Sequence, residues 1–129
     1  MTEDTRPAAG PAFILATANP DKAREIAEIV GDDIGLVPRP AGVPDVEETG
    51  ETLLDNARLK ARALVSATGR PALADDTGLE VDALGGAPGV RSARYAGEPV
   101  DPVANVAKLL SELAGKGSPD ARRARFRTV

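Results

Sequence analysis

The chain has 129 residues, with 16 Lys and Arg against 20 Asp and Glu, and a formal net charge of −4 at pH 7. It contains no Cys and no His, which excludes disulfides, thiolate metal sites, cysteine nucleophiles, Ser-His-Asp triads and His-ligated zinc. The acidic balance and the scarcity of aromatic residues (two Phe and one Tyr) argue against binding to a polynucleotide, and no apolar run approaches the ~18 residues of a membrane helix. The composition predicts a cytoplasmic domain, or part of one, whose chemistry rests on carboxylates, Lys, Arg, hydroxyls and Asn.

The first part of the chain predicts a strand followed by a capped helix. Met1–Pro11 is polar and rich in Pro, Ala and Gly, so we expect a disordered tail there. Phe13–Thr17 is a short apolar run, typical of a buried strand. Asn19 suits the N-cap of a helix that begins at Pro20, repeats apolar residues at helical spacing and ends at Gly31.

The middle of the chain predicts short strands around a second helix. Ile34–Pro44 contains three prolines and can supply only an edge strand and loops. A helix is predicted from about Thr52 to Thr68. Pro71–Asp75 indicates another short strand, which Thr77-Gly78 would break. Leu79–Leu84 is apolar at alternate positions and fits either a strand or a helical turn.

The last part of the chain predicts a loop, a helix and a terminal strand. Gly85–Gly97 holds four glycines and a proline, so we expect a shaped loop. A third helix is predicted from an Asp101 cap to Gly115. Arg122–Val129 alternates enough to form a strand, although few strands precede it as partners. The order of elements predicts an α/β fold that is incomplete at the C-terminus.

The turn from Thr17 to Lys22 could cradle phosphates. Free N–H groups at a helix start attract anions, and Lys22 adds a point charge in the first turn. Thr17 and Asn19 could donate to the ligand or shape the turn. The alternative is structural: Asn19 caps the helix, and Lys22 pairs with Glu25 in solvent. Spacing alone favours the structural alternative.

Lys60 is a second candidate, because it shares one face of its predicted helix with Leu53, Ala57 and Leu64. A charge within an apolar stripe must extend to solvent or meet an anion. Asn56 lies one turn before Lys60 and can reach the same place. A lysine that simply extends to solvent at the helix flank explains the pattern equally well.

Two pairs of adjacent acids, Glu47-Glu48 and Asp75-Asp76, could supply metal ligands. Asp75-Asp76 follows an apolar strand, where the loops of α/β folds commonly carry the site, and successive strand residues point to opposite faces. One carboxylate from each pair could hold Mg²⁺ together with phosphate oxygens of a substrate. Adjacent acids are also common on solvated surfaces. Neither G-x-x-x-x-G-K-[ST] nor G-x-G-x-x-G occurs in the chain.

Three segments occur in the order and spacing of one known family. They read A-T-x-N-x-x-K-x-x-E (Ala16–Glu25), E-E-T-G-x-T-x-x-x-N-A-x-x-K-A (Glu47–Ala61) and A-D-D-[ST]-G-L-x-V-D-A-L-G-G-x-P-G-V-x-S-A-R-Y-A-G (Ala74–Gly97). They resemble the inosine/xanthosine triphosphate pyrophosphatases. The resemblance extends roughly from Phe13 to Phe126, and the third segment is long and specific.

The resemblance implies hydrolysis of non-standard purine nucleoside triphosphates (ITP, dITP and XTP) to the nucleoside monophosphate and pyrophosphate, with Mg²⁺ and usually as a homodimer. It also implies a mixed sheet flanked by helices, with a cleft between two lobes. By position, Asp76 would be the general base and a metal ligand, and Glu47 the second metal ligand, with Glu48 nearly equivalent. The substrate would contact Thr17, Ala18, Asn19, Pro20, Asp21, Lys22, Lys60 and Thr77.

The chain departs from this family beyond the strand at Phe126. Family members continue with a Phe-Gly-Tyr-Asp and a Ser-His-Arg segment that recognise the purine base. Neither occurs here, because the chain lacks His and its one Tyr is Tyr95 in Ser-Ala-Arg-Tyr. We therefore expect residues 12–129 to be the N-terminal part of one C-terminally truncated pyrophosphatase domain. The alternatives are an inactive or merely nucleotide-binding relative, and an interaction protein whose exposed sheet pairs with another chain.

Overall fold

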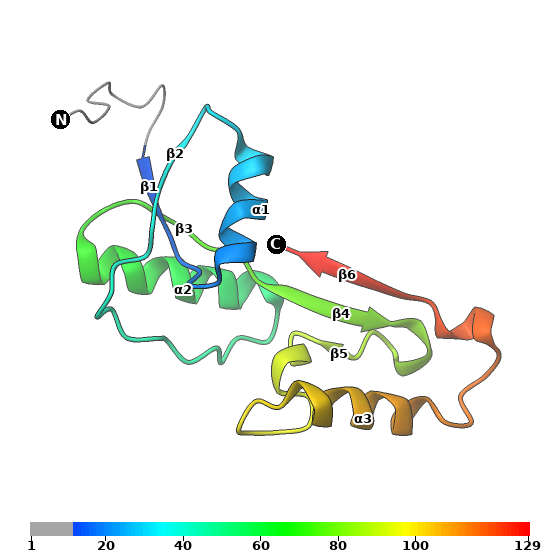
Figure 1. The fold of residues 1–129 in the computed structure, drawn as a ribbon. Helices are drawn as coiled ribbons and strands as arrows, with labels where there is room; N and C mark the ends of the chain where they lie inside the picture. The colour runs from blue at the N-terminus through cyan, green and yellow to red at the C-terminus, as the bar shows by residue number, and fades with distance from the viewer. Residues whose placement is uncertain (1–11) are drawn as a thin grey trace. The chain divides into compact units, whose positions relative to one another are not determined.

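A computed structural model describes residues 12–129, and Figure 1 shows its fold. The chain divides into two compact units. The first takes residues up to Glu48 together with Arg58–Ala74, and the second takes Thr49–Ala57 together with Asp75–Val129. The tail predicted at Met1–Pro11 lies outside the described residues.

The first unit contains a three-stranded parallel sheet in the order β2-β1-β3. Its strands are β1 (Ala12–Leu15), β2 (Gly35–Val37) and β3 (Ala72–Leu73), and β2 lies at the edge that the prolines of its segment predict. Parallel neighbours need a crossover between them. The helix α1 (Pro20–Val30) provides it between β1 and β2 (Figure 1). The second half of the central strand β1 is buried, with Ile14 1% and Leu15 4% exposed.

The start and end of α1 confirm the predicted caps. Asn19 Oδ1 accepts hydrogen bonds from the backbone N–H groups of Asp21 (2.9 Å) and Lys22 (3.4 Å). Pro20 occupies the first helical position, where its missing N–H costs nothing. Gly31 ends the helix with a positive φ of 66°, and its N–H donates to Ala27 O at 3.1 Å. Each of these signals is local in the sequence.

The helix α2 (Leu53–Thr68) confirms the apolar stripe. Leu53, Ala57 and Leu64 are 6%, 6% and 2% exposed. At its start, Thr52 Oγ1 accepts a hydrogen bond from the N–H of Asp55 at 3.0 Å, which satisfies one of the free donors of the first turn. The residues of the stripe that follow Ala57 belong to the first unit.

The second unit contains a three-stranded antiparallel sheet in the order β5-β4-β6. Its strands are β4 (Thr77–Val81), β5 (Pro88–Gly89) and β6 (Ala124–Thr128). Figure 1 shows β4 and β6 running side by side, and their register pairs Leu79 with Phe126. The strand predicted over Arg122–Val129 is confirmed, and β4 is the partner that the sequence did not reveal.

The predicted strand break at Thr77-Gly78 is wrong, because these two residues begin β4. Gly78 serves close strand contact rather than a turn: a Cβ at this position would collide with the backbone carbonyl of Gly89 in β5. The segment Leu79–Leu84, for which strand and helical turn were both open, divides between the two. The strand β4 ends at Val81, and a single 3₁₀ turn, η1 (Asp82–Leu84), follows.

The helix α3 (Pro102–Leu113) begins at the predicted cap, since Asp101 Oδ1 accepts hydrogen bonds from the N–H groups of its first turn. The predicted shaped loop before it includes β5 and a 3₁₀ turn, η2 (Ser92–Arg94). Side chains of α3 hold this loop: Asn105 Nδ2 donates to Ala93 O at 2.8 Å, and Lys108 Nζ donates to Tyr95 O at 2.9 Å.

An ion pair joins β4 and β6 on the face that carries Glu80. Arg125 Nε donates to Glu80 Oε1 at 2.8 Å, and Arg127 Nη1 lies 3.8 Å from Glu80 Oε2. The hydrogen bond to Glu80, together with the charges of Glu80 and Asp82, raises the pKa of Arg125 above its usual value. Pairing of opposite charges across strands therefore supports this register.

The predicted α/β class is confirmed, with parallel strand pairs in one sheet and antiparallel pairs in the other. Helices α1 and α2 accompany the parallel sheet, and α3 belongs to the antiparallel unit. Within residues 12–129, none of the helices is long and apolar enough to cross a membrane.

Candidate active site

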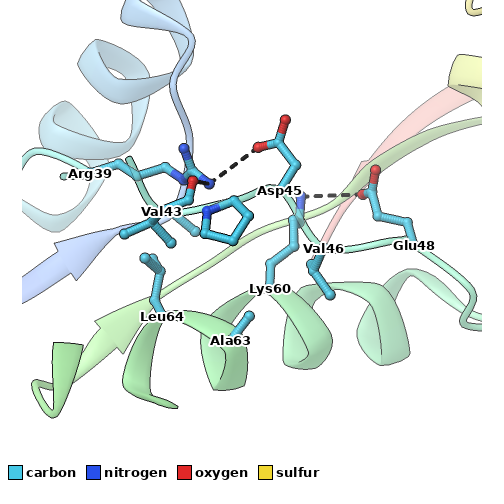
Figure 2. Close-up of a pocket in the computed structure, with 10 residues that line it drawn as sticks. Arg39, Val43, Asp45, Val46, Glu48, Lys60, Ala63 and Leu64 are labelled. Carbon is cyan, nitrogen blue, oxygen red and sulfur yellow. Dashed lines mark hydrogen bonds and ion pairs between the residues drawn. The ribbon is translucent and has the colours of Figure 1, made fainter. Parts of the chain in front are cut away.

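The first unit contains a hollow of about 300 Å³ with charged and apolar walls. In Figure 2 the charged ends of Arg39, Asp45, Lys60 and Glu48 lie on one side of it, and apolar side chains of α2 lie on the other. The residues that line it are Ala16, Arg39, Val43, Pro44, Asp45, Val46, Glu48, Lys60, Ala63 and Leu64. Ala16 comes directly after β1, so the hollow opens where the phosphate-cradle candidate begins.

Lys60 meets an anion from its place in the apolar stripe. Its side chain is 25% exposed, and its Nζ lies 3.5 Å from Glu48 Oε1. Figure 2 shows Lys60 extending from α2 toward Glu48, which belongs to the acidic segment of residues 46–51. Of the two acids predicted as alternative metal ligands, Glu48 lines the hollow, whereas Glu47 is exposed and lies outside its lining. The metal assignment of Glu47 stays a prediction.

Arg39 and Asp45 line the same hollow and were not identified from the sequence. Arg39 Nη2 donates to Val43 O at 2.7 Å and lies 3.1 Å from Asp45 Oδ1. Arg39 follows β2 by two residues, and the carboxyl ends of neighbouring parallel strands meet at one edge of a sheet. This rule could have predicted that Arg39 lies near the site. The prolines on both sides of Arg39 indicate only a loop, so the strand before it was not used to place this residue.

The turn from Thr17 to Lys22 has the structure of a self-contained cap. Thr17 Oγ1 accepts the N–H of Asn19 at 3.1 Å, and Asn19 Oδ1 accepts the next two donors of the turn. The structural alternative for Asn19 is therefore confirmed. A second hollow of about 410 Å³ is lined by this turn, from Thr17 to Pro20, and by Arg39. Arg39 thus lines both of these hollows. Substrate contact by Thr17, Ala18, Asn19, Pro20, Asp21 and Lys22 stays a prediction.

Asp76 and Thr77 lie in the second unit at the end of the β4–β6 ladder. The backbone of Asp76 exchanges two hydrogen bonds with Val129 (2.9 and 3.0 Å), and its Oδ1 accepts the N–H of Thr77 at 3.1 Å. Thr77 Oγ1 lies 2.7 Å from Thr128 Oγ1. The strand pairing therefore fixes the backbone that carries the predicted general base, whose role stays a prediction together with that of Thr77.

The carboxylates of residues 12–129 do not gather into a group of three or more that could hold a metal ion. Mg²⁺ differs from metals that need such a cage, because it is usually bound through one or two carboxylates, several waters and substrate phosphates. The metal assignments of Glu47 and Asp76 stay predictions.

Asn56 fixes the end of the acidic segment to the start of α2. It is 1% exposed, and its Oδ1 accepts the N–H of Gly50 at 2.7 Å. Within the part of the chain that the structure describes, its Nδ2 has no hydrogen-bond partner. A Cβ on Gly50 would lie 2.6 Å from Asn56 Oδ1, so only glycine fits here without a shift. The helical spacing predicted that Asn56 reaches the same place as Lys60, whereas its contact with Gly50 was not predicted.

The family model of the Ham1 family matches residues 13–129. The chain is 54% identical over 120 residues to the dITP/XTP pyrophosphatase of Desulforamulus reducens and 50% identical over 120 residues to that of Photorhabdus laumondii. These alignments cover 91% and 90% of this chain and 59% of each relative. The chain therefore spans about three fifths of the length of these relatives.

Solved structures agree with the sequence comparison. A HAM1 protein from Coxiella burnetii has a TM-score of 0.79 and 42% identity, over 92% of this chain and 60% of that one. The dITP/XTP pyrophosphatase from Mycobacterium abscessus has a TM-score of 0.69 and 41% identity, over 91% of this chain and 62% of that one. The resemblance read from the three motifs is confirmed: the chain belongs to the Ham1 family.

Proposed function

We propose that this chain carries the phosphate- and metal-binding part of an enzyme that hydrolyses ITP, dITP and XTP to the nucleoside monophosphate and pyrophosphate. The observation that carries the proposal is the hollow at the end of β1, where Lys60 Nζ lies 3.5 Å from Glu48 Oε1 and Arg39 is part of the same lining. The relatives from Desulforamulus reducens and Photorhabdus laumondii, named dITP/XTP pyrophosphatases, support the choice of substrates.

The reaction breaks the bond between the α-phosphorus and the oxygen that bridges to the β-phosphate. Asp76 would take a proton from the attacking water as the oxygen of that water bonds to the α-phosphorus. The departing pyrophosphate carries the bridging oxygen and its electron pair. Lys22 and Lys60 would stabilise the charge that grows on the phosphate oxygens.

The remaining predicted residues would orient the substrate. The turn of Thr17, Ala18, Asn19, Pro20 and Asp21 would lie against the phosphates, and the hydroxyl of Thr77 would donate to the substrate. Glu47 and Asp76 are the proposed ligands of Mg²⁺, which, when bound with phosphate oxygens, neutralises their charge and polarises the phosphorus. Glu48 is the alternative to Glu47, and its place in the lining of the hollow supports it.

Release of pyrophosphate from ITP, dITP and XTP by the purified chain with Mg²⁺ tests this proposal. Asp76→Asn should lower turnover roughly 10²- to 10⁴-fold, the usual contribution of a general base. Asp120→Asn, which changes an exposed carboxylate of the same unit, should leave turnover unchanged. Turnover that survives Asp76→Asn would contradict the role of the carboxylate.

The alternative is a chain that binds nucleotide without turnover. Such a chain would release no pyrophosphate from any of the three substrates in this assay. It would still bind pyrophosphate with Mg²⁺, and that binding would depend on Lys60. We also propose that residues 12–129 form the N-terminal part of one pyrophosphatase domain. The proposal further includes a homodimer and a cytoplasmic location. Sedimentation of the purified chain tests the dimer directly.

A further inference from the structure

The guanidinium of Arg39 and the ammonium of Lys60 line one hollow, which the proposed function assigns to phosphates. Both side chains line this hollow of the first unit, and each ends next to a carboxylate, Asp45 for Arg39 and Glu48 for Lys60 (Figure 2). The two cations and the two acids cancel in charge. Paired charges of this kind keep cations in place until a more highly charged anion displaces the carboxylates.

The contacts of Arg39 differ in strength. Its Nη2 donates to Val43 O at 2.7 Å, which fixes the side chain along the loop after β2. Its other partner, Asp45 Oδ1 at 3.1 Å, belongs to a side chain that is 98% exposed. Ion pairs with one partner in solvent contribute little, because water screens them. The carboxylate of Asp45 is therefore a partner that an incoming phosphate can replace at small cost.

The position of Arg39 in the fold points to the same ligand. It follows the carboxyl end of β2, and β2 pairs in parallel with β1, whose carboxyl end leads into the Thr17–Lys22 turn. The side chain of Arg39 is 16% exposed and lines both the hollow beside Lys60 and the hollow beside this turn. A planar guanidinium can present two parallel N–H groups to phosphate oxygens, whereas the ammonium of Lys60 acts as a point charge.

We propose that Arg39 is a further substrate-binding residue, which contacts oxygens of the polyphosphate together with Lys60 and is held before binding by Val43 O and Asp45. This inference rests on the proposed function. It adds to it a residue that none of the three sequence motifs contains.

Titration calorimetry of the full chain with inorganic pyrophosphate and Mg²⁺ tests the inference. Arg39→Met should weaken binding roughly 10- to 100-fold, the loss expected for charge-assisted hydrogen bonds to an anion. Arg39→Lys should lose less, because it keeps the charge without the planar fork. Arg62→Met is the matched control: it removes an exposed arginine of α2 that lies outside both hollows, and it should change Kd less than about twofold.

The substitution Asp45→Asn gives a second, independent test of the inference. It removes the competing carboxylate and should tighten pyrophosphate binding about two- to fivefold. This gain in affinity should vanish when Asp45→Asn is combined with Arg39→Met, because the gain depends on the Arg39 guanidinium, for which Asp45 and the phosphate compete. If Arg39→Met lowers the melting temperature, Arg39→Gln, which keeps an N–H donor for Val43 O, replaces it and should show the same loss of affinity.

Two results would overturn the inference in different ways. If Lys60→Met abolishes pyrophosphate binding while Arg39→Met and Arg39→Gln behave like Arg62→Met, Arg39 is only a support for its loop, and the proposed function stands. If the unaltered chain does not bind pyrophosphate with Mg²⁺ at all, the inference and the proposed phosphate site are both wrong.

Discussion

Replacing Gly50 by Ala tests how closely the acidic segment lies against the start of α2. A Cβ at Gly50 would lie 2.6 Å from Asn56 Oδ1 and 2.6 Å from Asp55 Cβ, whereas ordinary contact begins at 3.4 Å. Both neighbours would therefore have to move away by 0.8 Å, the difference between 3.4 and 2.6 Å. Asp55 and Asn56 belong to the first turn and a half of a helix, so their backbone cannot shift freely.

The cost of this substitution has three parts. Overpacking of this size costs about 1–3 kcal/mol. Displacing Asn56 Oδ1 lengthens the 2.7 Å hydrogen bond that it accepts from Gly50, and losing that bond costs about 1 kcal/mol more. The backbone of Gly50 is not left-handed, so Ala also stabilises by about 0.4–1 kcal/mol through the entropy of the unfolded chain. The expected net loss is therefore about 1–3.5 kcal/mol.

Urea unfolding followed by circular dichroism measures this loss as a shift of the midpoint by about 1 M or more. Thr49→Ala, at an exposed neighbouring residue, should change the free energy of unfolding by less than about 0.5 kcal/mol. The combination of Gly50→Ala with Asn56→Ala should cost less than the sum of the single changes, because the second removes one colliding atom. A Gly50→Ala chain as stable as Thr49→Ala would refute the described contact.

Asn19→Ala removes the oxygen that caps α1 and should lower the free energy of unfolding by about 1 kcal/mol in the same urea assay; unchanged stability would contradict the cap. Glu47→Gln should raise the Mg²⁺ concentration for half-maximal pyrophosphate release roughly tenfold, while Glu48→Gln should raise KM without that shift. The reverse pattern would assign the metal to Glu48. Thr77→Val should cost about 1 kcal/mol of stability through loss of its 2.7 Å contact with Thr128, and Thr77→Ser should not.

The elements whose signals lie within a few residues were predictable from the sequence. Asn19 and Asp101 are capping residues with a proline directly after them, and both helices begin where these residues place them. The apolar stripe of α2 was readable from spacing alone, because a helix brings residues three and four apart onto one face. The place of Lys60 within that stripe indicated that its ammonium would either extend to solvent or meet an anion, and the structure places Glu48 beside it.

The glycines were harder to interpret, because a glycine can serve a turn or a close approach between backbones. Gly31 is of the first kind and was read correctly as a helix end. Gly78 is of the second kind: it lies inside β4 against Gly89, and the sequence suggested a strand break instead. The neighbour that makes the difference is distant in the chain, so no local pattern distinguishes the two cases.

The family, the residues that cap the starts of α1 and α3, and the residue types available for phosphate and metal chemistry could be read from the chain alone. The pairing of β4 with β6, nearly fifty residues later, and the hollow that Arg39 and Asp45 line with Lys60 and Glu48 became known only from the fold. The physical reason is the range of the interactions involved. Caps and periodic stripes arise from hydrogen bonds and contacts within one or two turns, whereas strand partners and the walls of a hollow arise from packing between segments that the chain order does not relate.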